Sequence, residues 1–385
     1  MTVTPASAPA APRARLAWPD VGRGLSILGV VLLHASTSIP GGTETFIQPL
    51  NDVLTPLRLP LFFLISGYFS AKVLRQSLSS LAARRLWFFL VPYVVWASVD
   101  IVQSAAASTI AHGADPLTWE AYGDRLTQGV TIYWFFQMLI VCNLWLWATR
   151  RLGTVAAFAV TFAPLLLLAQ QQMVPDWQFR IMVYVPIFMI GARARQLVAQ
   201  VARAAANPVV GGGLLVAGVL IELRYRVFRA ELAEGAFAEP RVFSAAGWQF
   251  VFDRNDLVIG VELVYRLALI PVAVALAVVL SRVPGVSQAV QLLGRNTLVL
   301  YIGHPLGMFV FLHLFTLRGV DFAAHLNGWF LLQFLFCAVG CAVAWAASRT
   351  PYVQWLLTPP QLVRRQARAT SATLRDTTPA ATGRG

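Results

Sequence analysis

The chain of 385 residues is 57% hydrophobic and only 12% charged, which excludes a water-soluble globular domain and indicates a multi-pass membrane protein. Its net charge of +13 comes almost entirely from arginine, since Lys72 is the sole lysine. The arginines cluster in short loops and near the C-terminus, as topology determinants do, so we expect no nucleic-acid partner. Three cysteines within apolar runs show no spacing typical of a metal site or disulfide framework, so we expect no metal.

Apolar runs predict ten membrane-spanning helices, and therefore an all-α polytopic fold in a cell membrane. The stretch at residues 242–252 is also apolar but too short to span, and we expect it at the membrane interface. The ten predicted spans lie near residues 24–40, 53–70, 86–107, 130–149, 152–170, 179–193, 208–223, 257–280, 296–316 and 327–347.

Polar, low-complexity sequence at both ends predicts disordered tails over residues 1–17 and 351–385, the second rich in arginine. A transmembrane domain fills residues 18–350. Arginine is concentrated in the loops that share a side with the two tails, which predicts that both termini are cytoplasmic. The long loop near residues 224–256 then lies outside, with its basic residues balanced by acidic ones.

The first predicted span begins with a polar turn and is interrupted by one ionisable ring. Arg23 and His34 are eleven residues apart, about three helical turns or roughly 16 Å, so both project from nearly the same face. Arg23 reads most simply as an anchor at the membrane edge. His34 is either a packing residue that hydrogen-bonds a neighbouring helix or a functional group. The cost of an ionisable side chain inside a membrane favours function.

The second and third spans carry further arginines. Arg58 lies several residues inside its span, between Pro56 and Pro60, where a charge requires a partner or water. Arg84 and Arg85 stand at the start of the third span. By themselves they indicate a membrane anchor, and the alternative is a basic patch for phosphates.

The ninth span holds a second histidine at membrane depth. Tyr301 and His304 follow Thr297 at the spacing that places side chains on one helical face. His304 lies about 12 Å into the membrane and His34 about 15 Å from the same side. Two intramembrane histidines at similar depth are better explained by a functional site than by packing.

Taken together, these segments resemble the acyltransferase 3 family of membrane-bound O-acyltransferases, across most of residues 18–310. The resemblance begins with the D-x-x-R-G turn at Asp20 to Gly24 and a histidine separated from Arg23 by ten residues. It continues through PLFFLISGYF at 60–69, RRLWFFLVPY at 84–93, YWFFQMLI at 133–140 and LGRNTLVLYIGHP at 293–305.

The resemblance implies ten membrane helices and transfer of an acyl group, usually acetyl, from cytosolic acyl-CoA. It implies an outer acceptor hydroxyl, for which we expect an envelope glycan or glycolipid. Acyl-CoA, the acceptor and the lipid bilayer are then the partners. The family's arginine and histidine map onto Arg23 and His34.

Acyl transfer to a hydroxyl requires a base or nucleophile, cations for the CoA phosphates and a donor for the oxyanion. We assign His34 as base or transient acyl carrier, supported by His304 and Tyr301. The competing hypothesis is a proton-coupled transporter or flippase, with His34, Arg58 and His304 as a relay. The cofactor-binding residues are predicted to be Arg23, Arg84 and Arg85, and the substrate-binding residues Arg58 and Asp20.

Overall fold

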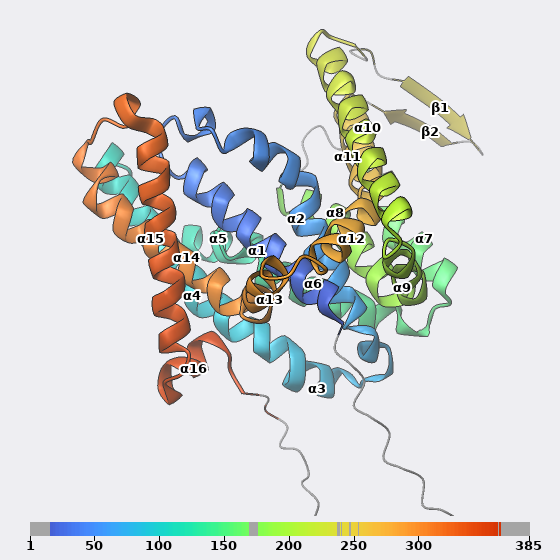
Figure 1. Ribbon diagram of the computed structural model, residues 1–385, viewed down its shortest axis with the longest axis horizontal. Helices are drawn as coiled ribbons and strands as arrows, with labels where there is room; N and C mark the ends of the chain where they lie inside the picture. Colours follow the sequence, from blue (N-terminus) through green and yellow to red (C-terminus); the bar gives the residue numbers. More distant parts are fainter. Residues whose placement is uncertain are drawn as a thin grey trace, which may run out of the picture.

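The computed structural model describes residues 16–168, 176–236, 239, 241–245, 248–252, 254–360 and 362 (Figure 1). Most of both predicted tails, residues 1–15 and 363–385, lies outside the described residues. The described chain is helical apart from one hairpin. Its helices are α1 Ala17–Thr37, α2 Gln48–Tyr68, α3 Leu78–Leu81, α4 Trp87–His112, α5 Trp119–Gln128, α6 Trp134–Ala148, α7 Thr154–Leu168, α8 Asp176–Arg193, α9 Arg195–Ala204, α10 Pro208–Ala233, α11 Arg254–Ala268, α12 Ile270–Leu280, α13 Val286–Arg295, α14 Thr297–Leu314, α15 Leu326–Ala347 and α16 Pro351–Leu357.

Each of the ten predicted spans overlaps a helix or a pair of consecutive helices. Among the described residues, six helical segments are long and apolar enough to cross a membrane, and seven if α8 and α9, bent by 83°, form one broken span. The structure is therefore that of an all-α, multi-pass membrane protein. Because α1, α6 and α7 are not among those segments, the count of ten stays a prediction.

Two segments have structure beyond what the sequence predicts. The apolar stretch expected at the membrane interface contributes to two paired antiparallel strands, β1 Arg241–Ala245 and β2 Trp248–Phe252, which project beyond the bundle (Figure 1), and its interface position stays a prediction. The range 351–385, predicted as a tail, begins with α16. Here the indole of Trp96 on α4 donates a hydrogen bond to the Leu356 carbonyl, 3.0 Å away. A tertiary contact thus orders residues whose composition alone indicates disorder.

Helix α1 runs through the centre of the bundle and packs against α2, α12, α13, α14 and α15. Glycines bring the backbones together. A Cβ atom on Gly24 of α1 would lie 2.0 Å from the Val290 carbonyl oxygen, and one on Gly294 of α13 would lie 1.8 Å from the Asp20 carbonyl oxygen. Gly67 on α2 meets α8 as closely. Such contacts are typical of membrane helix packing.

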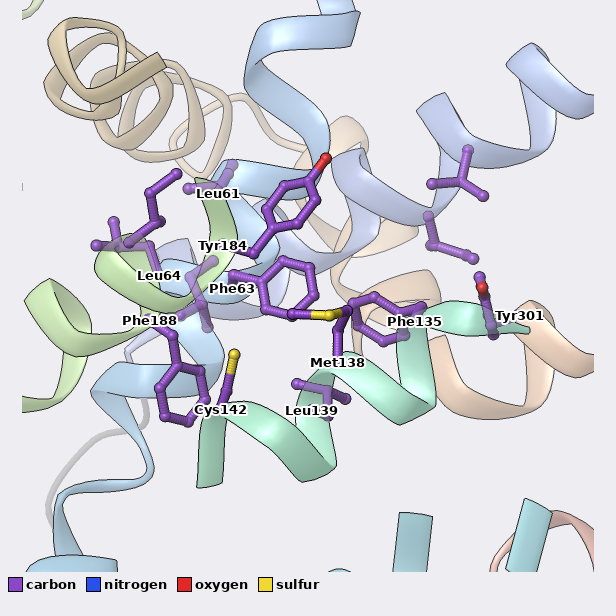
Figure 2. Packing of buried hydrophobic residues seen from close by; sticks show 14 of the residues in the cluster. Leu61, Phe63, Leu64, Phe135, Met138, Leu139, Cys142, Tyr184, Phe188 and Tyr301 are labelled. Carbon is purple, nitrogen blue, oxygen red and sulfur yellow. The ribbon is translucent and has the colours of Figure 1, made fainter. Parts of the chain in front are cut away.

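Aromatic rings fill the interior where α2, α6 and α8 meet. The ring of Phe63 stacks on Tyr184 at 4.7 Å between centroids, and Phe62 meets Phe135 edge-on at 4.6 Å. Figure 2 shows Phe63, Phe135 and the side chain of Met138 packed together in this region, with Tyr301 beside them. This apolar layer fixes the three helices around α1.

The bundle has two distinguishable ends. One end, called the tail side, holds the start of α1, the end of α2 and both ends of the described chain. There the ring of Trp18 contacts that of Tyr68 at 6.0 Å, and the Leu362 amide donates to the Ala83 carbonyl at 3.2 Å. The opposite end, the hairpin side, carries β1 and β2 (Figure 1). Both described termini share one side, and the assignment of that side to the cytoplasm stays a prediction.

Candidate functional site

The two membrane-embedded histidines are in direct contact. Nδ1 of His34 on α1 lies 2.8 Å from Nε2 of His304 on α14, and their rings stack with centroids 5.1 Å apart at 16°. His304 is fully buried, whereas His34 is half-buried. The sequence predicts similar membrane depths for the two histidines. The structure joins them by a hydrogen bond although they stand 270 positions apart in the chain.

A backbone carbonyl determines which ring nitrogens carry protons in this pair. Nδ1 of His304 lies 3.3 Å from the Leu300 carbonyl oxygen, four residues earlier on α14. A carbonyl only accepts, so Nδ1 of His304 is the donor and Nε2 accepts. His34 then donates from Nδ1, which leaves its Nε2 lone pair available as a base.

Tyr301 positions this pair without bonding to it. Its ring lies 5.7 Å from that of His304, and its hydroxyl donates to the Ile132 carbonyl at 2.5 Å. In the other direction, the hydroxyl of Tyr133 donates a hydrogen bond to the Ile302 carbonyl at 3.2 Å. These two bonds tie α14 to the start of α6. The phenol of Tyr301 is therefore engaged in structure, and its ring forms a wall beside the histidines.

Arg58 is buried in α2 next to α1. Its Nη2 donates to the Thr55 hydroxyl at 3.2 Å and its Nη1 to the Gly29 carbonyl at 3.5 Å. Its aliphatic stem packs against α1 at Gly29, where a Cβ would lie 3.4 Å from Cδ of Arg58. The guanidinium is close enough to His34 to interact with its ring electrostatically. Arg58 is thus a buried cation held against α1, five residues before the candidate base on that helix.

A cavity of about 230 Å³ opens on the tail side. Its polar wall carries three arginines, and Tyr301 closes its deep end toward the histidines. The remaining lining is mostly apolar, from α1, α2, α4, α6 and α14. The lining residues are Arg23, Ser26, Ile27, Val30, Leu59, Phe62, Ser66, Arg85, Phe88, Phe89, Phe135, Leu139, Gly294, Arg295, Thr297, Leu298 and Tyr301.

The three arginines of this cavity are held from different helices. Arg23 lies over the ring of Phe69 at 5.0 Å, and Nη2 of Arg85 donates to the Ser70 hydroxyl at 2.5 Å. Arg85 belongs to the π-helical turn Ala82–Leu86, a geometry often found at functional sites. Arg295 pairs with the buried carboxylate of Asp20 at 3.4 Å.

The structure separates some residues that the sequence grouped. Arg84 is exposed and does not line the cavity, while its neighbour Arg85 does. Asp20 lies on the tail side, nine residues or roughly 13 Å along α1 from Gly29, so it is not brought to Arg58. Sequence reasoning missed Arg295 as a site residue, although it stands inside the LGRNTLVLYIGHP motif.

Comparison with known proteins assigns the chain to a family. The acyltransferase 3 family model, described as an acyltransferase domain, matches residues 16–349, which include every residue of the histidine pair and the arginine-lined cavity. No curated protein and no solved structure matches the chain. The family match spans most of the sequence, and the chain therefore belongs to the acyltransferase 3 family of membrane acyltransferases.

Proposed function

We propose that the protein transfers an acyl group, typically acetyl, from cytosolic acyl-CoA to a hydroxyl of a carbohydrate or related acceptor of the cell envelope. The observation that carries the proposal is the oriented His34–His304 pair next to the arginine-lined cavity. An imidazole with a fixed tautomer and an available Nε2 is suited to general base catalysis. Such a group beside a phosphate-binding mouth matches the requirements of acyl transfer from a CoA thioester.

The cavity fits the donor in its chemistry. Arg23, Arg85 and Arg295 present guanidinium groups, which bind phosphates through paired N–H donors. The apolar walls beyond them suit the slender arm and acyl group of the thioester. The CoA phosphates then stay at the tail-side mouth, and the thioester carbonyl lies near Tyr301, one helical turn from His304.

The chemical step follows from this placement. Nε2 of His34 removes the proton from the acceptor hydroxyl, and the oxygen attacks the thioester carbonyl. The C–O bond forms, the C–S bond breaks, and the CoA thiolate leaves with the proton returned by His34. His304 accepts a hydrogen bond from His34 throughout and holds its ring in place. Arg58, beside His34, supplies positive charge for the developing oxyanion.

A covalent variant uses the same groups. Nε2 of His34 attacks the thioester first, and the acyl-imidazole then passes its acyl group to the acceptor oxygen. Free CoA released before any acceptor is added, in an amount equal to the enzyme, would distinguish this variant. Direct transfer releases CoA only together with ester.

The experiment that tests the proposal uses membranes that contain the protein and acetyl-CoA labelled in the acetyl group. We expect one CoA released for each acetyl ester formed, and mild base to release the label as acetate. Membranes without the protein are the control. Movement of a solute across the membrane with no acyl-CoA consumed would overturn the proposal in favour of a transporter.

A further inference from the structure

A second polar cavity opens on the hairpin side, between α2, α10 and α11. Its volume is about 560 Å³, larger than that of the tail-side cavity. Figure 1 shows α10 and α11 side by side, rising above the rest of the bundle toward the hairpin. We call this cavity the outer cleft. It shares no lining residue with the arginine-lined cavity.

The outer cleft is built around two glutamates and two tyrosines in a crossed arrangement. The Tyr225 hydroxyl of α10 donates to Glu262 of α11, and the Tyr265 hydroxyl of α11 donates to Glu222 of α10. The two tyrosine rings lie parallel, 3.8 Å apart between centroids at 5°. Each glutamate is thus fixed by a side chain from the opposite helix.

Arginines complete the network. Arg266 donates to Glu262 through Nε at 2.9 Å and through Nη2 at 2.5 Å, and Nε of Arg226 donates to Glu222 at 2.8 Å. Arg266 and Tyr265 are buried, inside a helical segment apolar enough to span a membrane. Ionisable groups in such a position are retained where they serve a pathway or a site. The bonds named here occupy two of the roughly four acceptor positions on Glu222.

The balanced charges that line the outer cleft favour an uncharged ligand. Three carboxylates, those of Asp52, Glu222 and Glu262, face three arginines across the lining. The third arginine, Arg229, joins Arg226 and Arg266. A phosphate or carboxylate would meet as many negative as positive groups. Fixed carboxylate acceptors, guanidinium donors and a tyrosine wall instead suit a neutral ring that carries several hydroxyls.

The outer cleft is connected through two residues to the helix that carries the candidate base. Thr55 lines the cleft and accepts the hydrogen bond from Arg58 at 3.2 Å. Arg58 in turn donates to the Gly29 carbonyl of α1 at 3.5 Å. Hydrogen bonds therefore lead from the outer cleft to α1, five residues before His34.

We propose that the outer cleft binds the acceptor as a neutral, polyhydroxylated ring and directs one hydroxyl past Arg58 to His34. This inference rests on the proposed acyl transfer. It adds a binding site at α2, α10 and α11 and a ligand class. On this proposal Glu222 and Glu262 are acceptor-binding residues, and donor and acceptor enter from opposite ends.

The test is reversible blockage of the outer cleft in intact cells. Asp52→Cys places a thiol at its exposed rim, and a membrane-impermeant methanethiosulfonate that carries a sulfonate modifies it. We expect base-labile acetyl ester in the envelope fraction to fall at least tenfold against the same variant before treatment, and a thiol reductant to restore it. The wild type, with its three cysteines, and Asp115→Cys, exposed in the loop before α5, are treated in parallel.

Three further readouts decide between outcomes. Acetyl ester formation that continues unchanged after complete modification of the introduced rim thiol would overturn the inference. Absence of acyl-CoA consumption and ester in the untreated wild type would instead overturn the proposed function. Maltose and glycerol phosphate are then compared as protectants of the rim thiol against the reagent. Slower modification with maltose supports a neutral ring, and protection by glycerol phosphate alone would overturn that ligand class.

A second variant separates binding from a purely structural role. Tyr225→Phe removes the hydroxyl that reaches Glu262 and keeps the ring, with Tyr352→Phe, an exposed tyrosine of α16, as the matched control. We expect Tyr225→Phe to lower ester formation several-fold while the KM for acetyl-CoA and the amount of folded protein extracted in detergent stay unchanged. Equal ester formation in the two variants, or a parallel rise in the KM for acetyl-CoA, would contradict an acceptor site.

Discussion

The two cavities of the molecule are built on opposite principles. The arginine-lined cavity on the tail side combines three cations with apolar walls, and the buried Asp20 pairs with one of those cations, Arg295. The outer cleft on the hairpin side balances three arginines with three carboxylates and adds two tyrosines. One end is therefore suited to a multiply charged ligand with an apolar arm, and the other to a neutral polar ligand. The histidine pair lies on α1 and α14, two of the helices that line the arginine-lined cavity.

The largest expected effect concerns the sides of the membrane on which the two cavities open. The arginine bias predicts the tail side in the cytoplasm. Cysteine in place of Ser79, which is exposed in α3, should resist an impermeant thiol reagent in intact cells, and cysteine in place of Ala236 after α10 should react. Reaction in the reverse pattern would turn the arginine-lined cavity outward, where no acyl-CoA is present.

The next expected effect removes the candidate base, to which the proposal brings both the donor and the acceptor. His34→Gln keeps a polar side chain and cannot cycle a proton near neutral pH, so acyl transfer should fall on the order of 10²-fold or more with normal expression. His304→Gln should lose less, about tenfold, because His304 orients His34 and does not take the proton. Transfer rates are compared in membranes with equal amounts of each variant. Near-wild-type transfer by His34→Gln would leave His34 as a packing residue.

A smaller effect should distinguish two adjacent arginines. Arg85→Gln removes a guanidinium from the arginine-lined cavity and should raise the KM for acetyl-CoA about tenfold, the scale of one hydrogen bond to a charged group. Arg84→Gln is the matched control, since Arg84 is exposed outside that cavity. The measurement is initial rate against acetyl-CoA concentration. Equal changes in both variants would mean that the pair acts only as a membrane anchor.

The smallest effect is the response to salt. Screening weakens attraction between a multiply charged ligand and partly exposed cations, so the KM for acetyl-CoA should rise about threefold as ionic strength increases from roughly 0.01 to 0.15 M. A neutral ligand in the outer cleft should not respond in this way. Protection of the rim thiol in the Asp52→Cys variant by maltose should therefore be the same at both ionic strengths. A salt dependence shared by both ligands would remove the contrast between the two cavities.

The sequence predicts the helices and the depth of the two histidines, because both follow from local hydrophobicity and helical rise. It does not predict that His34 and His304 touch, since that requires α1 and α14 to turn these faces toward each other. Nor does it separate Arg84 from Arg85, as neighbours on a helix point in directions about 100° apart and only packing decides which faces inward.

The outer cleft was missed for a different reason. Glu262 and Arg266 form an i, i+4 acid–base pair inside the apolar run at 257–280, and that pattern is readable from the sequence. Tyr225, the partner of Glu262 on α10, however, stands just past residue 223, where a membrane helix was expected to give way to a long loop. The structure continues α10 to Ala233, which turns an assumed loop into one wall of a cleft.

The glycine contacts between α1 and α13 have a consequence for how such a protein diversifies. Gly24 and Gly294 adjoin Arg23 and Arg295, so backbone contact sets the spacing of those two arginines and any larger side chain would break it. The walls of the outer cleft are joined instead by side chains, which substitutions can exchange one at a time. Substitution can therefore alter the outer cleft residue by residue, whereas the arginine-lined cavity allows little change at these two glycines.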